Sequence, residues 1–261
     1  MKTIEISSKD NEKIKVLKKL RAKKYRNKLN KFVVENLAII YDGLKSGRQP
    51  ESLFLTKEIM ENRSSKMKIV LGRTELGCVF LISESINKYF SSLETPSGVT
   101  AVYDKKKNKE LNFDKEIIYL NGIKDPGNMG TILRSAVAFG ISNVVIDEFC
   151  VDIYNPKVIQ AAKDAIFKVN IIFDKNRELL EKIKKNVKIF TTDVENGENI
   201  SSAFKRKEIF CLVLGSESQG VDEEIKKISD KSVNIKSDSN MESLNVAVSA
   251  GIIFHEMYSR K

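Results

Sequence analysis

The stretch from residue 117 to residue 146 constrains the fold more than any other part of the chain. Its first four residues are apolar and favour β-structure, and they lead into the turn-rich sequence Asn-Gly-Ile-Lys-Asp-Pro-Gly-Asn-Met-Gly at 121–130. Apolar residues then recur at helical spacing from 132 to 139, and residues 144–146 are again apolar and β-branched. A strand, a loop, a helix and a second strand in this order predict a parallel sheet.

The loop of this unit carries side chains that suit a binding site. Gly127 and Gly130 leave room for a ligand at the backbone, Asn128 can donate and accept hydrogen bonds, and Arg134 lies about one turn into the helix. A fixed guanidinium at that position suits a phosphate group. A tight turn followed by a solvated arginine on a surface helix explains the same residues, so both interpretations stay open.

The rest of the chain continues this pattern. Apolar runs at 169–173, 187–191 and 209–214 predict strands that alternate with helices. Such alternation predicts an open, doubly wound α/β sheet, which binds ligands beyond the carboxyl ends of its strands.

Two more loops carry candidate site residues. Residues 215–220 include Gly215 and Glu217, although a capped turn explains them equally well. Residues 240–245, in which Asn240 or Ser243 could act only as a helix N-cap, lead into a helix from 244 to 258. That helix is apolar or small nearly all round, which predicts a dimer interface.

The amino-terminal part predicts a small α/β domain of its own, covering residues 1–103. Its first elements are a helix at about 11–25 and a strand at 32–34. Residues 104–114 are polar and charged, as is typical of a linker, and residues 115–261 form the second domain.

Positive charge is concentrated in the first domain. The net charge is +10, and residues 1–100 hold 20 Lys and Arg against 11 Asp and Glu, which is +9. Ten basic residues and no acidic one occur from 13 to 31, a pattern that fits the phosphates of a nucleic acid. Lys23, Lys24 and Arg26 are predicted to contact these phosphates, and a solvated helix face is the alternative.

Composition excludes several classes of protein. The apolar runs are much shorter than the roughly 20 residues of a membrane span, and the amino terminus lacks a signal-peptide pattern, so a cytoplasmic protein is predicted. Cys78, Cys150 and Cys211 are widely spaced, which indicates buried thiols and no disulfide framework. The single histidine, His255, cannot form a histidine-rich centre, and no metal is predicted.

A dinucleotide-binding unit is one reading of the central stretch. Gly127-x-x-Gly130 follows a strand, and Asp147 ends the next strand about 20 residues on. The full Gly-x-Gly-x-x-Gly pattern and the Walker pattern are both missing, so a nicotinamide-dependent oxidoreductase is the weakest hypothesis.

Three segments together carry a different resemblance: 121–140, 214–220 and 242–248. In this order they resemble the three motifs of the SpoU (TrmH) family of RNA ribose 2′-O-methyltransferases, in the SPOUT superfamily. The resemblance covers the chain, because Lys23-Lys-Tyr-Arg26 and Phe32-Val-Val-Glu35 are similar to the family's substrate-binding domain, which has a ribosomal-protein-like fold.

The resemblance implies a fold and a reaction. The fold is α/β, with a carboxyl-terminal parallel-sheet SPOUT domain that contains a trefoil knot, binds S-adenosylmethionine there and forms homodimers. The reaction is methyl transfer to a ribose 2′-hydroxyl of structured RNA, with ribosomal RNA favoured over transfer RNA. A non-catalytic RNA-binding or ribosome-assembly protein on the same fold is the alternative.

The resemblance also assigns site residues position by position. Those matched to catalysis are Arg134, Asn128, Glu217, Ser243 and Asn245. Those matched to cofactor contacts are Phe190 or Thr191, Gly215, Ile235 and Leu244. The three loops offer no aromatic platform for a flipped base, which favours chemistry on the sugar.

The chain departs from the family pattern in several places. The departures are Val137 for an acid, Ser218 for a glycine, Lys236-Ser237 for Pro-Met, Asn36 for the glycine after Glu35, and Asp164 for a glycine. The catalytic residues of the motifs are retained. Asp164 adds a carboxylate near an RNA-facing surface, so we expect it to affect substrate choice before activity.

Overall fold

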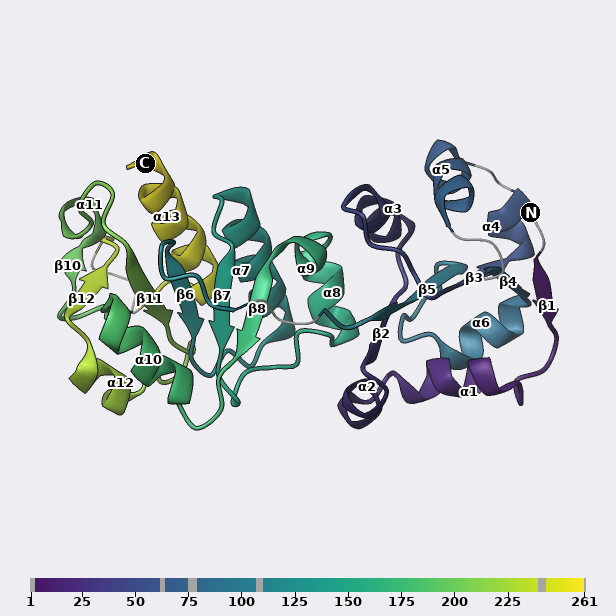
Figure 1. Cartoon of the computed structure of the whole chain (residues 1–261), viewed down its shortest axis with the longest axis horizontal. Helices are drawn as coiled ribbons and strands as arrows, with labels where there is room; N and C mark the ends of the chain where they lie inside the picture. Colours follow the sequence, from purple (N-terminus) through teal and green to yellow (C-terminus); the bar gives the residue numbers. More distant parts are fainter. Residues whose placement is uncertain (1–2, 62–63, 75–78, 107–109, 239–242, 261) are drawn as a thin grey trace. The chain divides into compact units, whose positions relative to one another are not determined.

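The computed structural model describes residues 3–61, 64–74, 79–106, 110–238 and 243–260. Cys78 and Asn240 therefore lie outside the described residues. The chain forms two compact units, of which the first contains residues 1–107 and 154–167 and the second contains the remainder (Figure 1). Each unit has its own sheet.

The first unit is built on a mixed five-stranded sheet in the order β1-β4-β3-β5-β2. Its strands are β1 (Ile4–Ile6), β2 (Lys31–Val34), β3 (Ser52–Thr56), β4 (Val79–Ile82) and β5 (Val99–Asp104). Its helices before the linker are α1 (Glu12–Lys19), α2 (Lys23–Leu29), α3 (Leu37–Lys45), α4 (Lys57–Glu61), α5 (Ser65–Arg73) and α6 (Glu84–Phe90). The α/β character predicted for this part of the chain is confirmed.

The single helix predicted at 11–25 is wrong, because the structure has α1 and α2 there with a turn between them. The turn is held by Arg26, whose guanidinium donates to the carbonyls of Leu20 at 2.9 Å and Arg21 at 2.7 Å. Leu20 is buried at this turn, so its packing in the core favours a bend where helical periodicity alone predicted one continuous helix.

The first unit also includes Tyr154–Phe167, which the sequence placed in the second domain. This segment contains α8 (Pro156–Ala162) and the start of α9 (Ala165–Lys168). The rings of Phe32 and Tyr154 lie 4.6 Å apart between centroids, and those of Tyr103 and Phe167 lie 4.9 Å apart. An aromatic cluster therefore joins this late segment to the amino-terminal sheet.

Asn36, a departure from the family glycine, has a structural role in the same unit. Its side-chain oxygen caps α3 by accepting from the backbone of Ala38 at 2.9 Å. Its amide nitrogen donates to Gln160 of α8 at 3.3 Å. The half-buried Asp164 lies between α8 and α9, and its predicted effect on substrate choice stays a prediction.

The second unit is built on a seven-stranded parallel sheet in the order β10-β12-β9-β11-β6-β7-β8. Its strands are β6 (Ile117–Leu120), β7 (Asn143–Ile146), β8 (Asn170–Phe173), β9 (Lys188–Thr192), β10 (Glu198–Asn199), β11 (Phe210–Leu214) and β12 (Lys231–Asn234). The five predicted strands are confirmed. Periodicity missed β10 and β12, which are short and mostly polar.

Helices cover both faces of this sheet. Figure 1 shows α7 (Pro126–Ala138) and α13 (Val246–Ser259) on one face, and α10 (Glu178–Asn186) and α12 (Glu223–Ile228) on the other. The short helix α11 (Ile200–Ala203) follows β10. Successive side chains of a strand point to opposite faces of the sheet. Ile117 and Tyr119 therefore share a face, and both pack with Leu180 of α10.

Membrane spans are ruled out for the described part of the chain, where every helix is too short or too polar to cross a bilayer.

Candidate active site

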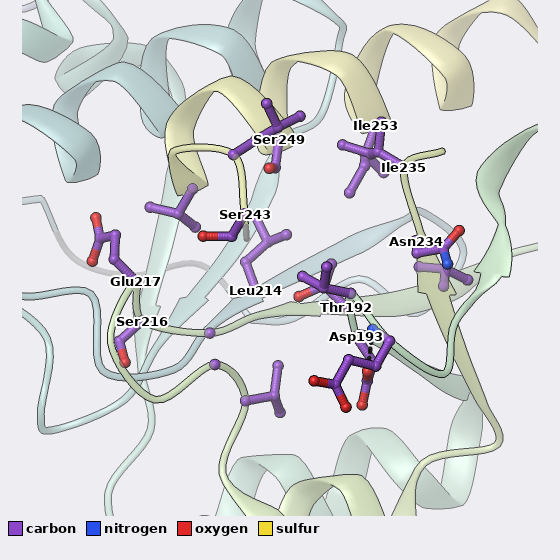
Figure 2. A pocket seen from close by; sticks show the side chains of 18 of the residues that line it. Thr192, Asp193, Leu214, Ser216, Glu217, Asn234, Ile235, Ser243, Ser249 and Ile253 are labelled. Atoms are coloured by element: carbon purple, nitrogen blue, oxygen red, sulfur yellow. Dashed lines mark hydrogen bonds between the residues drawn. The ribbon is translucent and has the colours of Figure 1, made fainter. Parts of the chain in front are cut away.

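A pocket of about 400 Å³ lies at the carboxyl ends of β9, β11 and β12. Parallel pairing places these ends at one edge of the sheet, where the predicted loops meet. Figure 2 shows Ser249 and Ile253 of α13 on one side of the pocket and Thr192 and Asp193 on the other. The pocket is therefore enclosed by parts of the chain that are distant in sequence.

Gly215 brings backbone to the surface of this pocket, as the sequence predicted. A Cβ atom added at Gly215 would overlap the backbone of Gly220, so a side chain does not fit. The loop closes on itself because Ser216 N donates to Gly220 O at 3.0 Å and Gly220 N donates to Ser216 O at 2.9 Å. Gly220 has a φ of +66°, which favours glycine.

Asn128, Glu217 and Asn245 come from the three motifs and form one hydrogen-bonded cluster. Asn128 Nδ2 donates to Glu217 Oε1, and Asn245 Nδ2 donates to Asn128 Oδ1 at 3.0 Å. Asn128 is half-buried and the other two side chains are exposed, so the cluster lies at the surface beside the pocket, which Glu217 also lines.

The two asparagines of the cluster are held by helix N-termini. Asn245 is the N-cap of α13, where its Oδ1 accepts from the backbone of Ala247 at 2.9 Å. Asn128 is in the first turn of α7, and its backbone N donates to the N-cap Asp125 at 2.7 Å. Ser243 is exposed and lines the pocket without capping the helix.

Arg134 is separate from this cluster. It is six residues beyond Asn128 on α7, roughly 9 Å along the axis and about 120° around it. Its side chain is exposed and makes no hydrogen bond or ion pair with the described residues. The guanidinium is therefore available to a ligand from outside the chain.

The residues predicted to contact the cofactor differ in whether they reach the pocket, and their contact with a cofactor stays a prediction. Gly215, Ile235 and Leu244 line the pocket. Thr191 does not, because it is fully buried and its hydroxyl is 3.0 Å from that of Ser232. The next residue, Thr192, lines the pocket instead, since successive strand side chains point to opposite faces.

Acidic groups predominate in the pocket. Among the described residues, Asp193, Glu195 and Glu217 line it, together with the ammonium group of Lys226. The backbone N–H of Asn196, followed by that of Glu195 and by Lys226, holds the pKa of Asp193 below its ordinary value in spite of partial burial. The pocket therefore favours a positively charged ligand.

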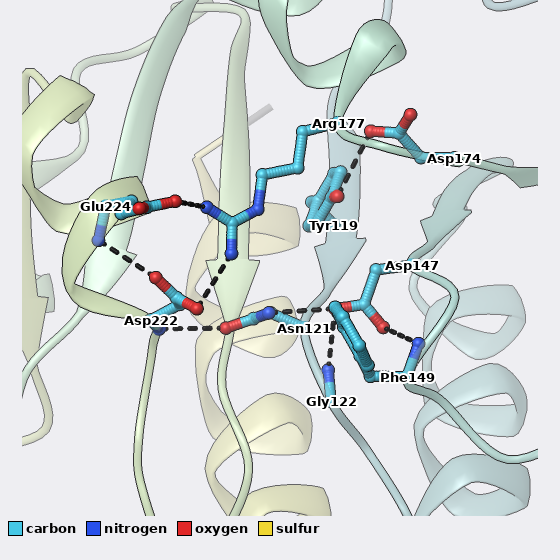
Figure 3. Close-up of polar contacts among 9 residues, drawn as sticks. All are labelled: Tyr119, Asn121, Gly122, Asp147, Phe149, Asp174, Arg177, Asp222 and Glu224. Carbon is cyan, nitrogen blue, oxygen red and sulfur yellow. Dashed lines mark hydrogen bonds and ion pairs between the residues drawn. The ribbon is translucent and has the colours of Figure 1, made fainter.

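A polar network that the sequence did not predict runs along the same edge (Figure 3). Asn121 Nδ2 donates to Asp147 at 2.8 Å, and Asn121 Oδ1 accepts from the backbone of Asp222 at 2.9 Å. Asp222 also pairs with Arg177 at 2.8 Å. These hydrogen bonds give Asp147 a structural role in joining loops, so its position after β7 does not require a dinucleotide ligand. In the sequence, only the spacing of Asp147 from the preceding glycines had singled it out.

The predicted RNA contacts differ in exposure. Lys23 and Lys24 are exposed on α2, whereas Arg26 is 3% exposed and holds the turn after α1. Arg26 was predicted as a phosphate contact, and its burial contradicts that role.

Comparisons with known proteins identify the class. The profile of the SpoU rRNA Methylase family matches residues 115–255, and that of the MRM3-like substrate binding domain matches residues 11–101. The first match covers more than half of the chain, which therefore belongs to the SpoU rRNA methylase family. The predicted family, fold class and enzyme class are confirmed, and family members use S-adenosylmethionine.

Individual relatives resemble nearly the whole chain. It is 29% identical over 254 residues to the 23S rRNA (guanosine(2553)-2′-O)-methyltransferase of Bacillus subtilis, covering 97% of this chain and 98% of that protein. A structure of a TrmH-family protein from Porphyromonas gingivalis aligns with a TM-score of 0.82 at 28% identity, covering 97% of this chain and 99% of that chain. An AdoMet-bound rRNA methyltransferase from Sinorhizobium meliloti, at 21% identity and TM-score 0.83 over 97% of each chain, shows the shared fold.

Proposed function

We propose that this protein transfers a methyl group from S-adenosylmethionine to the 2′-hydroxyl of one ribose in large-subunit ribosomal RNA. The cluster of Asn128, Glu217 and Asn245 carries the proposal, because it joins polar side chains of all three motifs beside the pocket. The choice of RNA is supported by the Bacillus subtilis relative, whose name specifies 23S rRNA.

The pocket fits S-adenosylmethionine in size and in charge. Its volume of about 400 Å³ is that of a small-molecule site, and its acidic lining favours a cationic sulfonium over a neutral thioether. Gly215, Ile235 and Leu244 would hold the cofactor, with the backbone of Gly215, which lines the pocket, supplying hydrogen bonds. When bound, the cofactor supplies an electrophilic methyl group.

Arg134 is proposed to hold a phosphate of the RNA. A ribose hydroxyl has a pKa far above neutral, so its proton must leave as the new bond forms. A guanidinium stays protonated, so Arg134 contributes as a charge that positions the phosphate. Among the motif side chains, the carboxylate of Glu217 is the group that can accept the hydroxyl proton. Asn128 and Glu217 would orient the sugar beside the phosphate.

Replacement of Arg134 tests this role. Arg134→Ala should reduce methyl transfer at least 100-fold and leave cofactor affinity and the melting temperature nearly unchanged, because the side chain is exposed and unbound to the described residues. Arg134→Lys retains the charge but loses the two-pronged donor, so it should recover only part of the activity. Near-normal turnover of the alanine variant would exclude the assignment.

The methylated atom is located by alkaline hydrolysis. A 2′-O-methyl group removes the nucleophile that cleaves the adjacent phosphodiester, so rRNA treated with the protein and S-adenosylmethionine should show one protected bond. Digestion to nucleosides checks the result, since radioactive methyl on a base would refute ribose chemistry. Parallel reactions with transfer RNA test the alternative substrate.

A homodimer through α13 is also proposed. Val248, Ile252 and Tyr258 are 51%, 39% and 55% exposed, while the opposite face of the helix is buried. Val248 and Ile252, one turn apart on the helix, form an exposed apolar patch of the type that a second subunit covers. Ile252→Glu should convert a dimer to a monomer in sedimentation velocity at micromolar concentration, and a monomeric wild-type protein would refute the proposal.

A further inference from the structure

Two loops at the carboxyl ends of β6 and β7 are joined into one structural unit. Ile123 N donates to Cys150 Sγ at 3.2 Å, and Val151 N donates to Ile123 O at 2.9 Å. These bonds add to the contact between Asn121 and Asp147. The loop that carries the first motif is therefore fixed to a loop outside the motifs.

Phe149 lies in that second loop, with its backbone fixed and its ring in solvent. Phe149 N donates to Asp147 Oδ1 at 3.0 Å, and the residue is 62% exposed (Figure 3). Its ring makes no aromatic or cation–π contact with any described residue. A single exposed apolar residue is common on protein surfaces. A binding role for Phe149 therefore has to be argued from its location and its neighbours.

A cation accompanies this ring. Lys124 follows Ile123 directly, is exposed, and has no hydrogen-bond or ion-pair partner in the described part of the chain. An aromatic face together with a cation is the combination that proteins use for single-stranded nucleic acid, where the ring stacks on a base and the cation pairs with phosphate.

The position of Phe149 suits contact with a nucleotide next to the reacting one. Strand β7 is two positions from β11 in the sheet, which is about 10 Å at the spacing of paired strands. Glu217 follows β11, so the ring lies a short distance along the same edge from the motif cluster. Adjacent nucleotides of an unpaired strand can bridge that separation.

We propose that Phe149 and Lys124 form a subsite for a nucleotide next to the methylated one. The ring of Phe149 stacks on that nucleotide's base, and Lys124 pairs with its phosphate. The inference rests on the proposed function, since it requires an RNA substrate. The expectation that the three motif loops offer no aromatic platform is unaffected, because Phe149 lies outside those loops.

Steady-state kinetics on an rRNA fragment that the wild-type protein methylates test the subsite. Phe149→Ala and Phe149→Leu should raise KM for RNA about tenfold, with kcat, calorimetric cofactor affinity and melting temperature unchanged. Phe149→Tyr keeps the ring and should behave as wild type. Phe173→Ala is the matched control, because Phe173 is also exposed (51%) at the end of a neighbouring strand.

Abasic substitutions in the RNA show whether the contact is direct. Removing the base at one position beside the methylated nucleotide should raise KM for the wild-type protein and cause no further rise for Phe149→Ala. Additive effects at every flanking position, or a normal KM for Phe149→Ala, would overturn the subsite while leaving the methyltransferase intact. Failure of the wild-type protein to methylate any RNA would instead refute the proposed function.

Discussion

Arg26, Lys23 and Lys24 belong to one basic run, yet their environments assign them different roles. Arg26→Ala removes two hydrogen bonds from a buried charged donor, so we expect a loss of about 1.5–3 kcal/mol in the free energy of unfolding, measured with urea. RNA affinity per folded molecule should be unchanged. Wild-type stability for this variant would contradict the structural role.

The exposed lysines should behave in the opposite way. Lys23→Ala combined with Lys24→Ala should leave the free energy of unfolding within about 0.5 kcal/mol of wild type. It should lower the slope of log affinity against log salt by about 0.7–0.9 for each phosphate that the protein no longer neutralises, as measured by filter binding. An unchanged slope would place the RNA elsewhere on the protein.

Asp193 predicts a response to acid. Backbone N–H donors from Asn196 and Glu195 and the nearby Lys226 hold its pKa below the ordinary value, so the stability that its carboxylate adds is present above the unfolded pKa near ~3.9. That stability disappears as the pH falls through the lower, folded pKa. Asp193→Asn should therefore be less stable than wild type at pH 6, with the difference shrinking below about pH 4 in thermal melts. A constant difference down to pH 2 would contradict this.

At the scale of elements, the loop after β11 depends on Gly215. Gly215→Ala places a Cβ against the backbone of Gly220, and because backbone cannot move aside as a side chain can, the loop must open. We expect cofactor affinity, measured by calorimetry, to fall at least tenfold and the melting temperature to drop. Gly72→Ala on α5 is the matched control, since nothing lies within 4 Å of the added atom. Equal effects of the two substitutions would remove the special role of Gly215.

At the scale of the whole molecule, the first unit is completed by residues from the second half of the chain. A fragment of residues 1–107 lacks Tyr154 and Phe167, so Phe32 and Tyr103 lose aromatic partners and Gly43 loses the ring that covers it. We expect this fragment to unfold at lower urea concentration than the same fragment joined by a flexible linker to residues 154–167. In the full chain, Phe167→Ala should cost about 3–5 kcal/mol.

Equal urea midpoints for the two fragments would show that the amino-terminal part folds independently. In that case the predicted boundaries at 103 and 115 would describe the domains better than the observed units do.

The sequence by itself determined the local elements of this protein and the identities of its motif residues. Strands such as 117–120 and 210–214 and the helical spacing from 132 follow from periodicity, which acts over a few positions, whereas the start of α7 at Pro126 lies inside the predicted loop. The three ordered motifs also identified the family, because their polar residues can be recognised in the sequence without knowing their arrangement in space.

Only the tertiary structure decided which of these residues work together. The contact of Asn128 with Glu217 and Asn245 spans about a hundred positions, and it forms because a parallel sheet brings the carboxyl ends of its strands to one edge. The pleat of β9 decided that Thr192 lines the pocket in place of Thr191. Tertiary packing likewise decides three other features: the burial of Arg26, the aromatic contacts of residues 154–167 and the exposure of Phe149. The spacing of residues along the chain does not indicate which side chains pack against one another.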